Sequence, residues 1–494
     1  MNDEVFLAGY GDKLSARPGD IVNFCVSVRE EQPVSAKLFR CVSSDPNPEG
    51  PGVIEEPADV YFSELNFDGV HQDFFPGSFG FSKAALFGEA KCDRSVAFKF
   101  FPTLLGKAEQ YIFSWSALSV SIDSRGHLLL KWNGAVVLTS SCRVVLRTWY
   151  SCHVRLTKNG ELSVALVRLN DMYREIQKKS GDWCNYELSG KVFIASKRQP
   201  PQRTGFFNGK VEALEIQCSG KPIGLWDFSK GIDSFLIPAI TGPDIKLQNS
   251  PTRGVCGSLW DGSEFNWRNK PSHYAAVHFH EDDIYDFGWK TSFSFKIPEE
   301  IKSGIYFMRI FSGDYFDAIP LFITPPRGKR TADLCILVPT FTYVVYGNHA
   351  RPDFDASWSK NKKNDDEYPY NPAAYKRYGL STYNMHRDGS GICFASHRRP
   401  IFNMRPGFKT FGKSTCSGLR HLQADTHLLS WLNKKGIEYD IVTDDVLNDE
   451  GVSILSGYKA VSTTTHPEYH TFETLNALKS YRDDGGALVY LGGN

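Results

Sequence analysis

The chain lacks an excess of charge of either sign. Its 494 residues include 56 Lys and Arg and 56 Asp and Glu, so the formal net charge is zero. Proteins that bind nucleic acids or anionic membranes use a basic field, and a balanced composition supplies none. We therefore expect neither nucleic acid nor membrane as a partner. The neutrality mildly favours an oligomer, because little net charge keeps copies apart.

Long apolar runs and a secretory leader are also missing. No stretch approaches the ~20 apolar residues that cross a bilayer. The start, MNDEVFLAGYGDK, is acidic and lacks the basic and then apolar pattern of a signal peptide. The eleven cysteines include no CxxC pair, which predicts free thiols in a reducing compartment. We expect a soluble, cytoplasmic protein.

Familiar nucleophile motifs are absent as well. The sequence contains no GxSxG turn, which is the motif that presents the serine of an α/β-hydrolase. Cys335, Cys393 and Cys416 stand outside any recognisable nucleophile motif. A serine or thiol mechanism is therefore disfavoured.

Strand-like segments dominate the first ~330 residues. Aromatics make up 14% of the chain, and aromatic side chains favour pleated, half-buried surfaces. Alternating runs at 20–28 and 35–42 predict two strands, and IPEEIKSGIYFMRI reads as strand, turn and strand. That ending is typical of an immunoglobulin-like β-sandwich. We assign residues 1–58 plus 240–327 to such a sandwich.

Another β-rich segment, residues 60–235, interrupts this sandwich. Its apolar runs recur about every 10–20 residues, and the turns Asn133-Gly134 and Asn159-Gly160 predict hairpins. The final FNGKVEALEI resembles the last strands of a laminin-G or concanavalin-like jelly roll. We therefore expect a jelly-roll insert.

Near residue 328 the sequence changes from strand-like segments to alternating strands and helices. ADLCILVPT is a continuous apolar strand, the kind that is buried on both faces of a parallel sheet. ADTHLLSWLNKKG predicts an amphipathic helix, and the strands EYDIVT, YKAVSTTT and ALVYLGG alternate with helices. This βαβαβ order predicts a doubly wound α/β domain over 328–494. Because the sequence stops at Asn494, directly after a core strand, we expect this domain to be incomplete.

Polar residues gather where three of these strands end. The first strand leads into FTYVVYGNH, the second into His466-Pro467-Glu468-Tyr469, and the third into GGN. Ligands of parallel α/β sheets bind at the carboxyl ends of the strands. The long segment 350–423 contains GLSTYN, and a loop of that length in a compact domain is usually functional.

These segments carry a family resemblance. PTFTYVVYGN, GLSTYN, YDIVTDDVL, HPEY and GGALVYLGGN resemble segments that occur in this order in the large, iron-binding subunit of N,N-dimethylformamidases. The resemblance covers essentially the whole chain and implies an amidotransferase-like fold for the α/β part, cut off at its C-terminal end. It also implies a mononuclear Fe³⁺ held by two tyrosinates and a carboxylate, and a small companion subunit in a hetero-oligomer.

Matched position by position, the resemblance implies the metal ligands Tyr346, Tyr383 and Glu468, and the catalytic residues His466 and Asn494. Tyr378 and Tyr343 remain alternatives to Tyr383. Fe³⁺ is a hard cation that favours anionic oxygen donors. Free tyrosine has a pKa of about 10, but coordination deprotonates such a ligand. The ion can then polarise an amide carbonyl or activate water.

We therefore expect an iron-dependent amide hydrolase that converts N,N-dimethylformamide to dimethylamine and formate. A related hydrolase of another small amide is one alternative. Another is a non-catalytic, carbohydrate-binding jelly-roll protein, because fold alone does not fix function. A rival metal signal is HFHEDD, where alternation places His278 and His280 on one strand face. We favour a solvated strand face for that segment.

Overall fold

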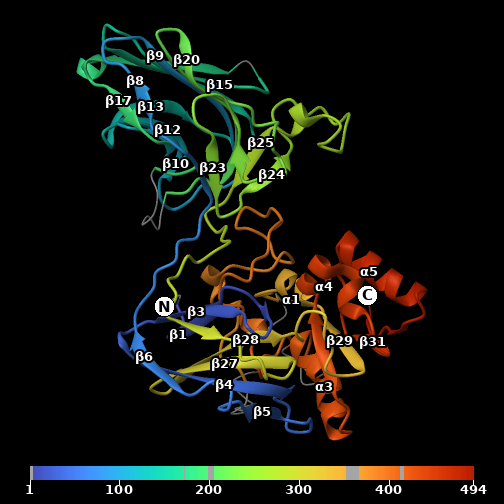
Figure 1. The fold of residues 1–494 in the computed structure, drawn as a ribbon. Helices are drawn as coiled ribbons and strands as arrows, with labels where there is room; N and C mark the ends of the chain where they lie inside the picture. The colour runs from blue at the N-terminus through green and yellow to red at the C-terminus, as the bar shows by residue number, and fades with distance from the viewer. Residues whose placement is uncertain (1–3, 172, 198–204, 352–366, 412–416, 494) are drawn as a thin grey trace. The chain divides into compact units, whose positions relative to one another are not determined.

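The structure is a computed structural model that describes residues 4–171, 173–197, 205–351, 367–411 and 417–493. It divides into two compact units (Figure 1). Unit 1 comprises Met1–Phe74, Tyr285–Asn384 and Gly391–Asn494, and unit 2 comprises Phe75–Ile284 and Met385–Ser390.

A β-sandwich forms the first part of unit 1. Its smaller sheet has the strand order β1 (Leu7–Gly11), β3 (Ile21–Val28), β26 (Phe293–Lys296). Its larger sheet has the order β2 (Ser15–Ala16), β28 (Tyr315–Ile323), β27 (Gly304–Ser312), β4 (Gln32–Ser44), β5 (Val53–Pro57), with β6 (Leu65–Gly69) also on β4. Because side chains alternate along a strand, Phe24, Leu38 and Met308 point inward and pack in one apolar core.

The predicted pairing between the first strands and the segment after residue 290 is present, because Phe24 pairs with Phe293. The immunoglobulin-like name for this sandwich remains a prediction.

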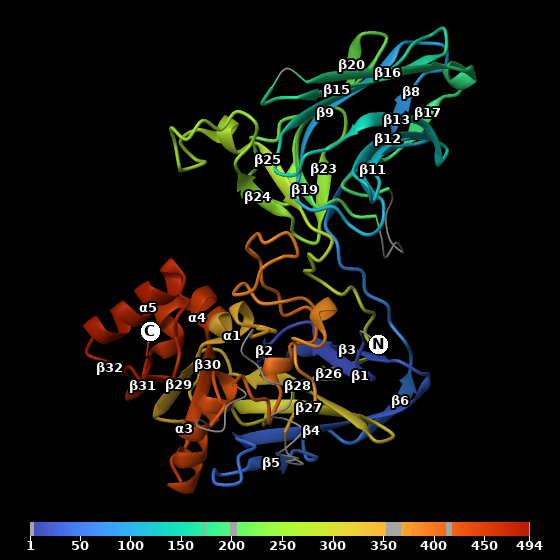
Figure 2. The ribbon, with the colours of Figure 1, turned by 180° about the vertical axis from the view of Figure 1, so that it is seen from behind.

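A four-stranded parallel sheet forms the second part of unit 1 (Figure 2). Its strand order is β30 (Tyr439–Thr443), β29 (Leu334–Val338), β31 (Ala460–Thr463), β32 (Ala487–Val489). The accompanying helices are α1 (Thr340–Val345), α3 (Leu422–Lys434), α4 (Asp444–Glu450) and α5 (Phe472–Asp483). Short 3₁₀ turns lie at η3 (Lys376–Tyr378), η4 (Phe402–Met404) and η5 (Gly451–Leu455).

Helices cover both faces of this sheet, as the apolar strand sequences predict. Side chains alternate along β29, so Ile336 packs with Leu429 of α3 on one face. On the other face Leu337 packs in a cluster with Leu447 of α4 and Leu478 of α5. The layer is therefore a doubly wound α/β arrangement, while its amidotransferase-like name remains a prediction.

Unit 2 contains two large sheets. One has the strand order β13 (Ala135–Arg143), β12 (His127–Trp132), β11 (Leu118–Ile122), β10 (Gln110–Trp115), β18 (Val192–Ile194), β7 (Phe79–Ser82), β23 (Ile245–Gln248), β21 (Leu236–Ile237). The other has the order β16 (Arg174–Ser180), β15 (Glu161–Arg168), β14 (Tyr150–Leu156), β9 (Arg94–Pro102), β19 (Gly209–Cys218), β20 (Lys221–Trp226), β22 (Ala239–Thr241). Strand β25 (Ala276–Phe279) pairs with β19 and with β24 (Thr252–Val255). The remaining elements are β8 (Leu86–Gly88), β17 (Leu188–Gly190), η1 (Asp182–Asn185) and η2 (Pro271–Tyr274).

The two sheets of unit 2 share one apolar core that includes Trp115 of β10, Phe100 of β9 and Leu166 of β15. Both predicted hairpins are present, because β12 pairs antiparallel with β13 and β14 with β15. At the first turn Asn133 and Gly134 both have positive φ, the conformation that a two-residue hairpin turn needs.

The predicted boundaries of the insert, 60–235, are wrong at both ends. Strand β6 pairs with β4 of the unit 1 sandwich, while β23 pairs with β7 and β25 with β19 inside unit 2. The division falls at 74/75 and 284/285 instead. These pairings join strands far apart in the sequence, so local patterns do not reveal them.

The predicted domain boundary at 327/328 does not coincide with a division between the two compact units. Phe307 and Phe322 of the sandwich share a core cluster with Ile336 and Leu429 of the α/β layer. Both parts therefore belong to unit 1. The short segment 385–390, which was expected in the α/β domain, belongs to unit 2 instead.

A buried ion pair holds the long segment between α1 and α3 to the sandwich. Arg405 Nε and Nη2 donate to the two carboxylate oxygens of Asp317 on β28, at 2.8 and 3.0 Å. The side chains of Arg405 and Asp317 are 1% and 0% exposed. Tyr368 OH and the Gly9 amide also donate to this carboxylate, at 3.0 and 2.9 Å.

We predict that Asp317→Asn lowers the free energy of unfolding by about 3–5 kcal/mol, because it leaves the Arg405 charge buried without a counter-charge. Urea denaturation measures the change. Asp314→Asn is the matched control, since Asp314 is exposed three residues away and should change stability by less than about 0.5 kcal/mol. A loss below roughly 1 kcal/mol for Asp317→Asn would contradict the assigned role.

Candidate functional site

Two neighbouring parallel strands of unit 1 place the first site residues. Strand β29 pairs with β31, with Leu337 opposite Thr463. Because parallel strands end at the same edge of a sheet, the residues that follow them meet there. Tyr346 follows α1 directly after β29, and Glu468 follows β31. Tyr383 comes from the long segment between α1 and α3.

The structure brings Tyr346, Tyr383 and Glu468 together. Tyr346 OH donates to Glu468 Oε2 at 2.8 Å, and Tyr383 OH donates to Glu468 Oε1 at 2.8 Å. The two phenol rings stack with centroids 4.1 Å apart and planes 13° apart. Tyr346 is 3% exposed and Tyr383 is 44% exposed, so one side of the cluster faces solvent.

Buried Thr342 fixes the loop that carries Glu468. Its Oγ1 accepts hydrogen bonds from the amides of Glu468 and Tyr469, both at 3.2 Å. Thr342 lies in α1, so the helix that positions Tyr346 also sets the backbone of Glu468. This explains why the two groups meet.

Imidazole and guanidinium groups surround the carboxylate. His466 Nε2 lies 3.1 Å from Glu468 Oε2, and Arg420 Nη2 lies 3.4 Å from His466 Nδ1. The Arg420 guanidinium lies 4.5 Å above the Tyr346 ring and reaches its hydroxyl at 3.3 Å. The His421 ring stacks on that of His466, with centroids 5.2 Å apart.

These contacts set the charges of the site. Burial raises the pKa of Tyr346, and its hydrogen bond with Tyr383 opposes that rise only in part. Burial and the bond with Tyr346 raise the pKa of Tyr383 to about 12. Burial alone would raise the pKa of Glu468, but the hydrogen bonds from both tyrosines outweigh it and lower this pKa. At neutral pH the cluster is therefore one carboxylate with two neutral phenols.

The donor set fits a hard metal ion. Two phenol hydroxyls converge on one carboxylate, each at the 2.8 Å of an ordinary O–H···O hydrogen bond. Such an ion would replace the two phenol protons, because a strong cation deprotonates its ligands. Two phenolates and the carboxylate would then carry three negative charges against a trivalent ion.

The alternative tyrosines lie elsewhere in unit 1. Tyr343 is buried and donates to Asp425, whose carboxylate also accepts from Thr464 at 2.8 Å. The Tyr378 hydroxyl accepts from the Val5 amide at 3.3 Å. Of these three tyrosines, Tyr383 is the one that hydrogen-bonds to Glu468 in the described part of the chain. Asn494, the other expected catalytic residue, lies outside the described residues.

Three residues of the site were not predicted from the sequence. Tyr469 OH lies 2.5 Å from Tyr383 OH, and its position directly after Glu468 in HPEY was the available signal. Arg420 sits in an irregular stretch before α3, and Thr342 is one of many threonines. For these two the sequence offers no signal, because their roles depend on tertiary contacts.

The expectation of a solvated face at HFHEDD is wrong. His278 is 6% exposed and His280 is 1% exposed, and both lie within unit 2. Among the described residues no helix is both long enough and apolar enough to cross a membrane.

Comparisons with known proteins give the family. Residues 252–494 match the family described as N,N-dimethylformamidase beta subunit-like, C-terminal. The chain is 30% identical over 558 residues to the N,N-dimethylformamidase beta subunit of Paracoccus aminophilus, covering 99% of this chain and 71% of that protein. The corresponding subunit of Alcaligenes sp. is 30% identical over 576 residues, covering 99% of this chain and 72% of that one. The chain belongs to the N,N-dimethylformamidase beta subunit family.

Those names say nothing of subunit size or of iron, so both stay predictions. Among solved structures, scytalido-glutamic peptidase with a transition-state-analogue inhibitor is 12% identical with a TM-score of 0.24. The match covers 35% of this chain and 97% of the peptidase. A likeness of that size carries no argument about function.

We predict that Thr342→Val speeds hydrogen exchange at the amide of Tyr469 and lowers the free energy of unfolding by about 1–3 kcal/mol. The valine keeps the shape but removes the acceptor of the Tyr469 amide, while the Glu468 amide keeps the His466 carbonyl at 3.1 Å. Exchange measured by mass spectrometry tests this. Thr342→Ser retains the hydroxyl and should preserve wild-type protection. Equal exchange rates in the valine variant and the wild type would show that Thr342 does not hold the loop that carries Glu468.

Proposed function

We propose that Tyr346, Tyr383 and Glu468 hold one Fe³⁺ and that the site hydrolyses N,N-dimethylformamide to dimethylamine and formate. The observation that carries this proposal is the convergence of the two phenol hydroxyls, each 2.8 Å from a different oxygen of the same carboxylate. Such a set of hard oxygen donors suits a trivalent cation. Membership of the dimethylformamidase beta subunit family supports the choice of substrate.

A bound ferric ion supplies Lewis acidity, which polarises an amide carbonyl and lowers the pKa of water. The chain's own residues shape the site around it. Tyr383 and Tyr469 present aromatic rings beside the carboxylate, and Tyr383 is partly open to solvent. A tertiary formamide carries no N–H, so an apolar aromatic wall matches its methyl groups better than hydrogen-bond acceptors would.

His466 is the proposed proton carrier. Its Nε2 faces the Glu468 carboxylate at 3.1 Å, so the ring hydrogen sits on Nε2 and points at that acceptor. Burial and the nearby Arg420 charge lower the pKa of His466, which leaves the imidazole neutral at neutral pH. We propose that it relays the proton released by the attacking water to the leaving amine.

A partner subunit is part of the proposal. The relatives are named as beta subunits, which supports a multi-subunit enzyme, and we propose a small companion subunit. The reducing compartment expected from the cysteine pattern supports a cytoplasmic location.

We predict that Tyr346→Phe, Tyr383→Phe and Glu468→Gln each lose iron and at least roughly 100-fold in kcat/KM, since even the outer partners of metal ligands are worth 10–100-fold. Each change keeps the side chain's shape but removes one anionic oxygen. Iron content, the visible phenolate-to-iron absorption and dimethylformamide hydrolysis are measured on the full-length protein with its partner.

Tyr343→Phe is the matched control. It removes a buried phenol hydroxyl on the same helix as Thr342, yet that hydroxyl donates to Asp425 and not to Glu468. This variant should keep its iron, colour and activity. Retention of all three in Tyr346→Phe and Glu468→Gln would show that the metal, if present, binds elsewhere.

A further inference from the structure

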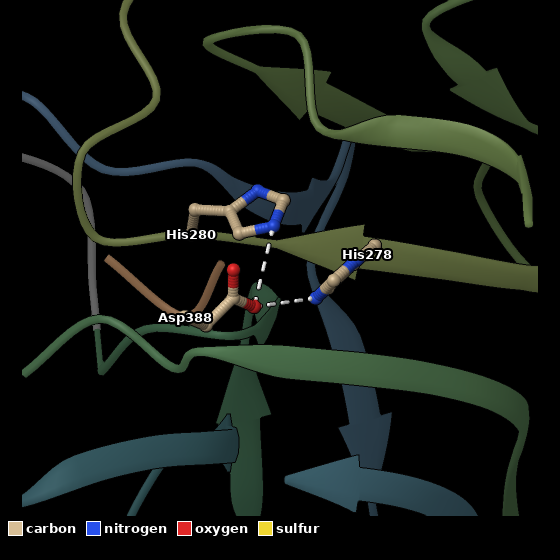
Figure 3. Close-up of side chains that lie close together, drawn as sticks. All are labelled: His278, His280 and Asp388. Carbon is tan, nitrogen blue, oxygen red and sulfur yellow. Dashed lines mark hydrogen bonds and ion pairs between the residues drawn. The ribbon is translucent and has the colours of Figure 1, made fainter. Parts of the chain in front are cut away.

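Unit 2 contains its own cluster of buried histidines and carboxylates. His278 lies on β25, His280 follows it, and Asp388 lies in the segment Met385–Ser390. Their side chains point toward one another (Figure 3). Asp388 Oδ2 lies 3.1 Å from His278 Nε2 and 3.7 Å from His280 Nε2. The residues are 6%, 1% and 8% exposed in chain order, His278 first.

Hydrogen bonds at both ring nitrogens of His280 indicate its tautomer. Its Nδ1 lies 3.0 Å from Asp283 Oδ2, an acceptor, so Nδ1 carries the hydrogen of a neutral ring. Its Nε2 then presents a lone pair to Asp388. The Ser390 hydroxyl lies 2.9 Å from this Nε2 but only 2.5 Å from Asp388 Oδ1, and a hydroxyl hydrogen serves one acceptor at a time. Asp388 Oδ1 also accepts from the Ser390 amide at 2.9 Å, so the hydroxyl hydrogen can serve Nε2, and a metal ion at Nε2 would replace that hydrogen bond.

The charge balance around the cluster favours a metal ion. Three carboxylates bond to its imidazoles: Asp283 to His280, Asp388 to His278, and Asp282 to His386 at 2.8 Å. The nearby cations have other partners. Lys210 donates to the Cys256 carbonyl at 3.1 Å, and Arg387 pairs with Glu281. His386 lies 2.8 Å from Asp282 and 3.4 Å from Asp283 and can carry one positive charge against the three carboxylates. A divalent cation would offset the charge that remains.

The distances suit tetrahedral coordination. Ligands about 2.0–2.1 Å from a tetrahedral Zn²⁺ lie roughly 3.3 Å apart, and the Nε2 to Oδ2 distances of 3.1 and 3.7 Å bracket that value. All three donor atoms lie within 4.8 Å of one another. Asp283 on His280 Nδ1 is the carboxylate partner that commonly orients a zinc-bound histidine.

We propose that His278 Nε2, His280 Nε2 and Asp388 Oδ2 bind one divalent transition-metal ion, best matched by Zn²⁺. The site goes beyond the proposed iron centre, which uses oxygen donors of unit 1. Three protein ligands would leave the fourth tetrahedral position to water. The ion clamps the segment Met385–Ser390 to the strand that carries His278, joining residues 110 apart in the chain.

Zinc binding is tested on the full-length chain carrying Tyr346→Phe, which disables the proposed iron site. After chelator treatment and dialysis, titration with Zn²⁺ should show one equivalent bound. Tm should rise by roughly 5 °C at about 100 times the Kd. In this background Asp388→Asn and His278→Gln should weaken Zn²⁺ binding at least 100-fold, while Asp283→Asn weakens it 10–100-fold.

Asp233→Asn is the matched control, since it removes an exposed carboxylate of unit 2 and should bind Zn²⁺ like the parent. X-ray absorption spectroscopy of the zinc-loaded parent should detect two imidazole ligands directly. The proposal can therefore be tested even if a variant fails to fold. Failure of the parent to bind Zn²⁺ overturns the proposal and leaves a hydrogen-bonded imidazolium. Equally tight binding by Asp388→Asn also overturns it. Loss in Asp283→Asn without loss in Asp388→Asn places the ion on the adjacent His280, Asp283 and His386 instead. Iron loss in Tyr346→Phe bears only on the proposed function, so the two can fail independently.

Discussion

The buried pair between Asp317 and Arg405 constrains the rest of unit 1. Neither charge is accessible to water, and half of a buried pair costs several kcal/mol, so the pair must form completely or not at all. Asp317 belongs to a sandwich strand, while Arg405 belongs to the long segment between α1 and α3. That segment, which also carries Tyr383, must therefore return to the sandwich. Arg399 reinforces the path, because its buried guanidinium donates to the carbonyls of Tyr378 and Gly379 at 2.8 and 2.6 Å.

Within this frame, one carboxylate organises the site. Glu468 accepts from Tyr346 and Tyr383, so the two phenols hold its pKa down while burial holds theirs up. The protein alone thus keeps two protons in a place suited to a cation. In the proposed function a hard cation would take the place of those two protons.

The sequence predicted elements and strand-end residues well, and long-range pairing poorly. The apolar run before Pro339 and the helix over α3 followed from periodicity, and the rule for parallel sheets placed Tyr346 near Glu468 before any contact was visible. Tyr383 came only from a family resemblance, since nothing local distinguishes it from Tyr378. Arg420 and Thr342 were missed because tertiary contacts define their roles. The insert boundaries were wrong because β25 pairs with β19, which lies far earlier in the chain, as in the pair of Gly209 with Phe279.

The two proposed metal sites differ in their donor atoms, which determine the ion that each would bind. The site at Glu468 offers two phenol oxygens and a carboxylate, which select a hard trivalent ion, whereas His278 and His280 offer imidazole nitrogens to a borderline divalent one. Tyr383 and Asp388 are five positions apart in the chain, yet each belongs to a different unit. One short stretch therefore carries a proposed ligand of each site. Because donor type rather than raw affinity separates such metals, the two proposed sites would favour different ions.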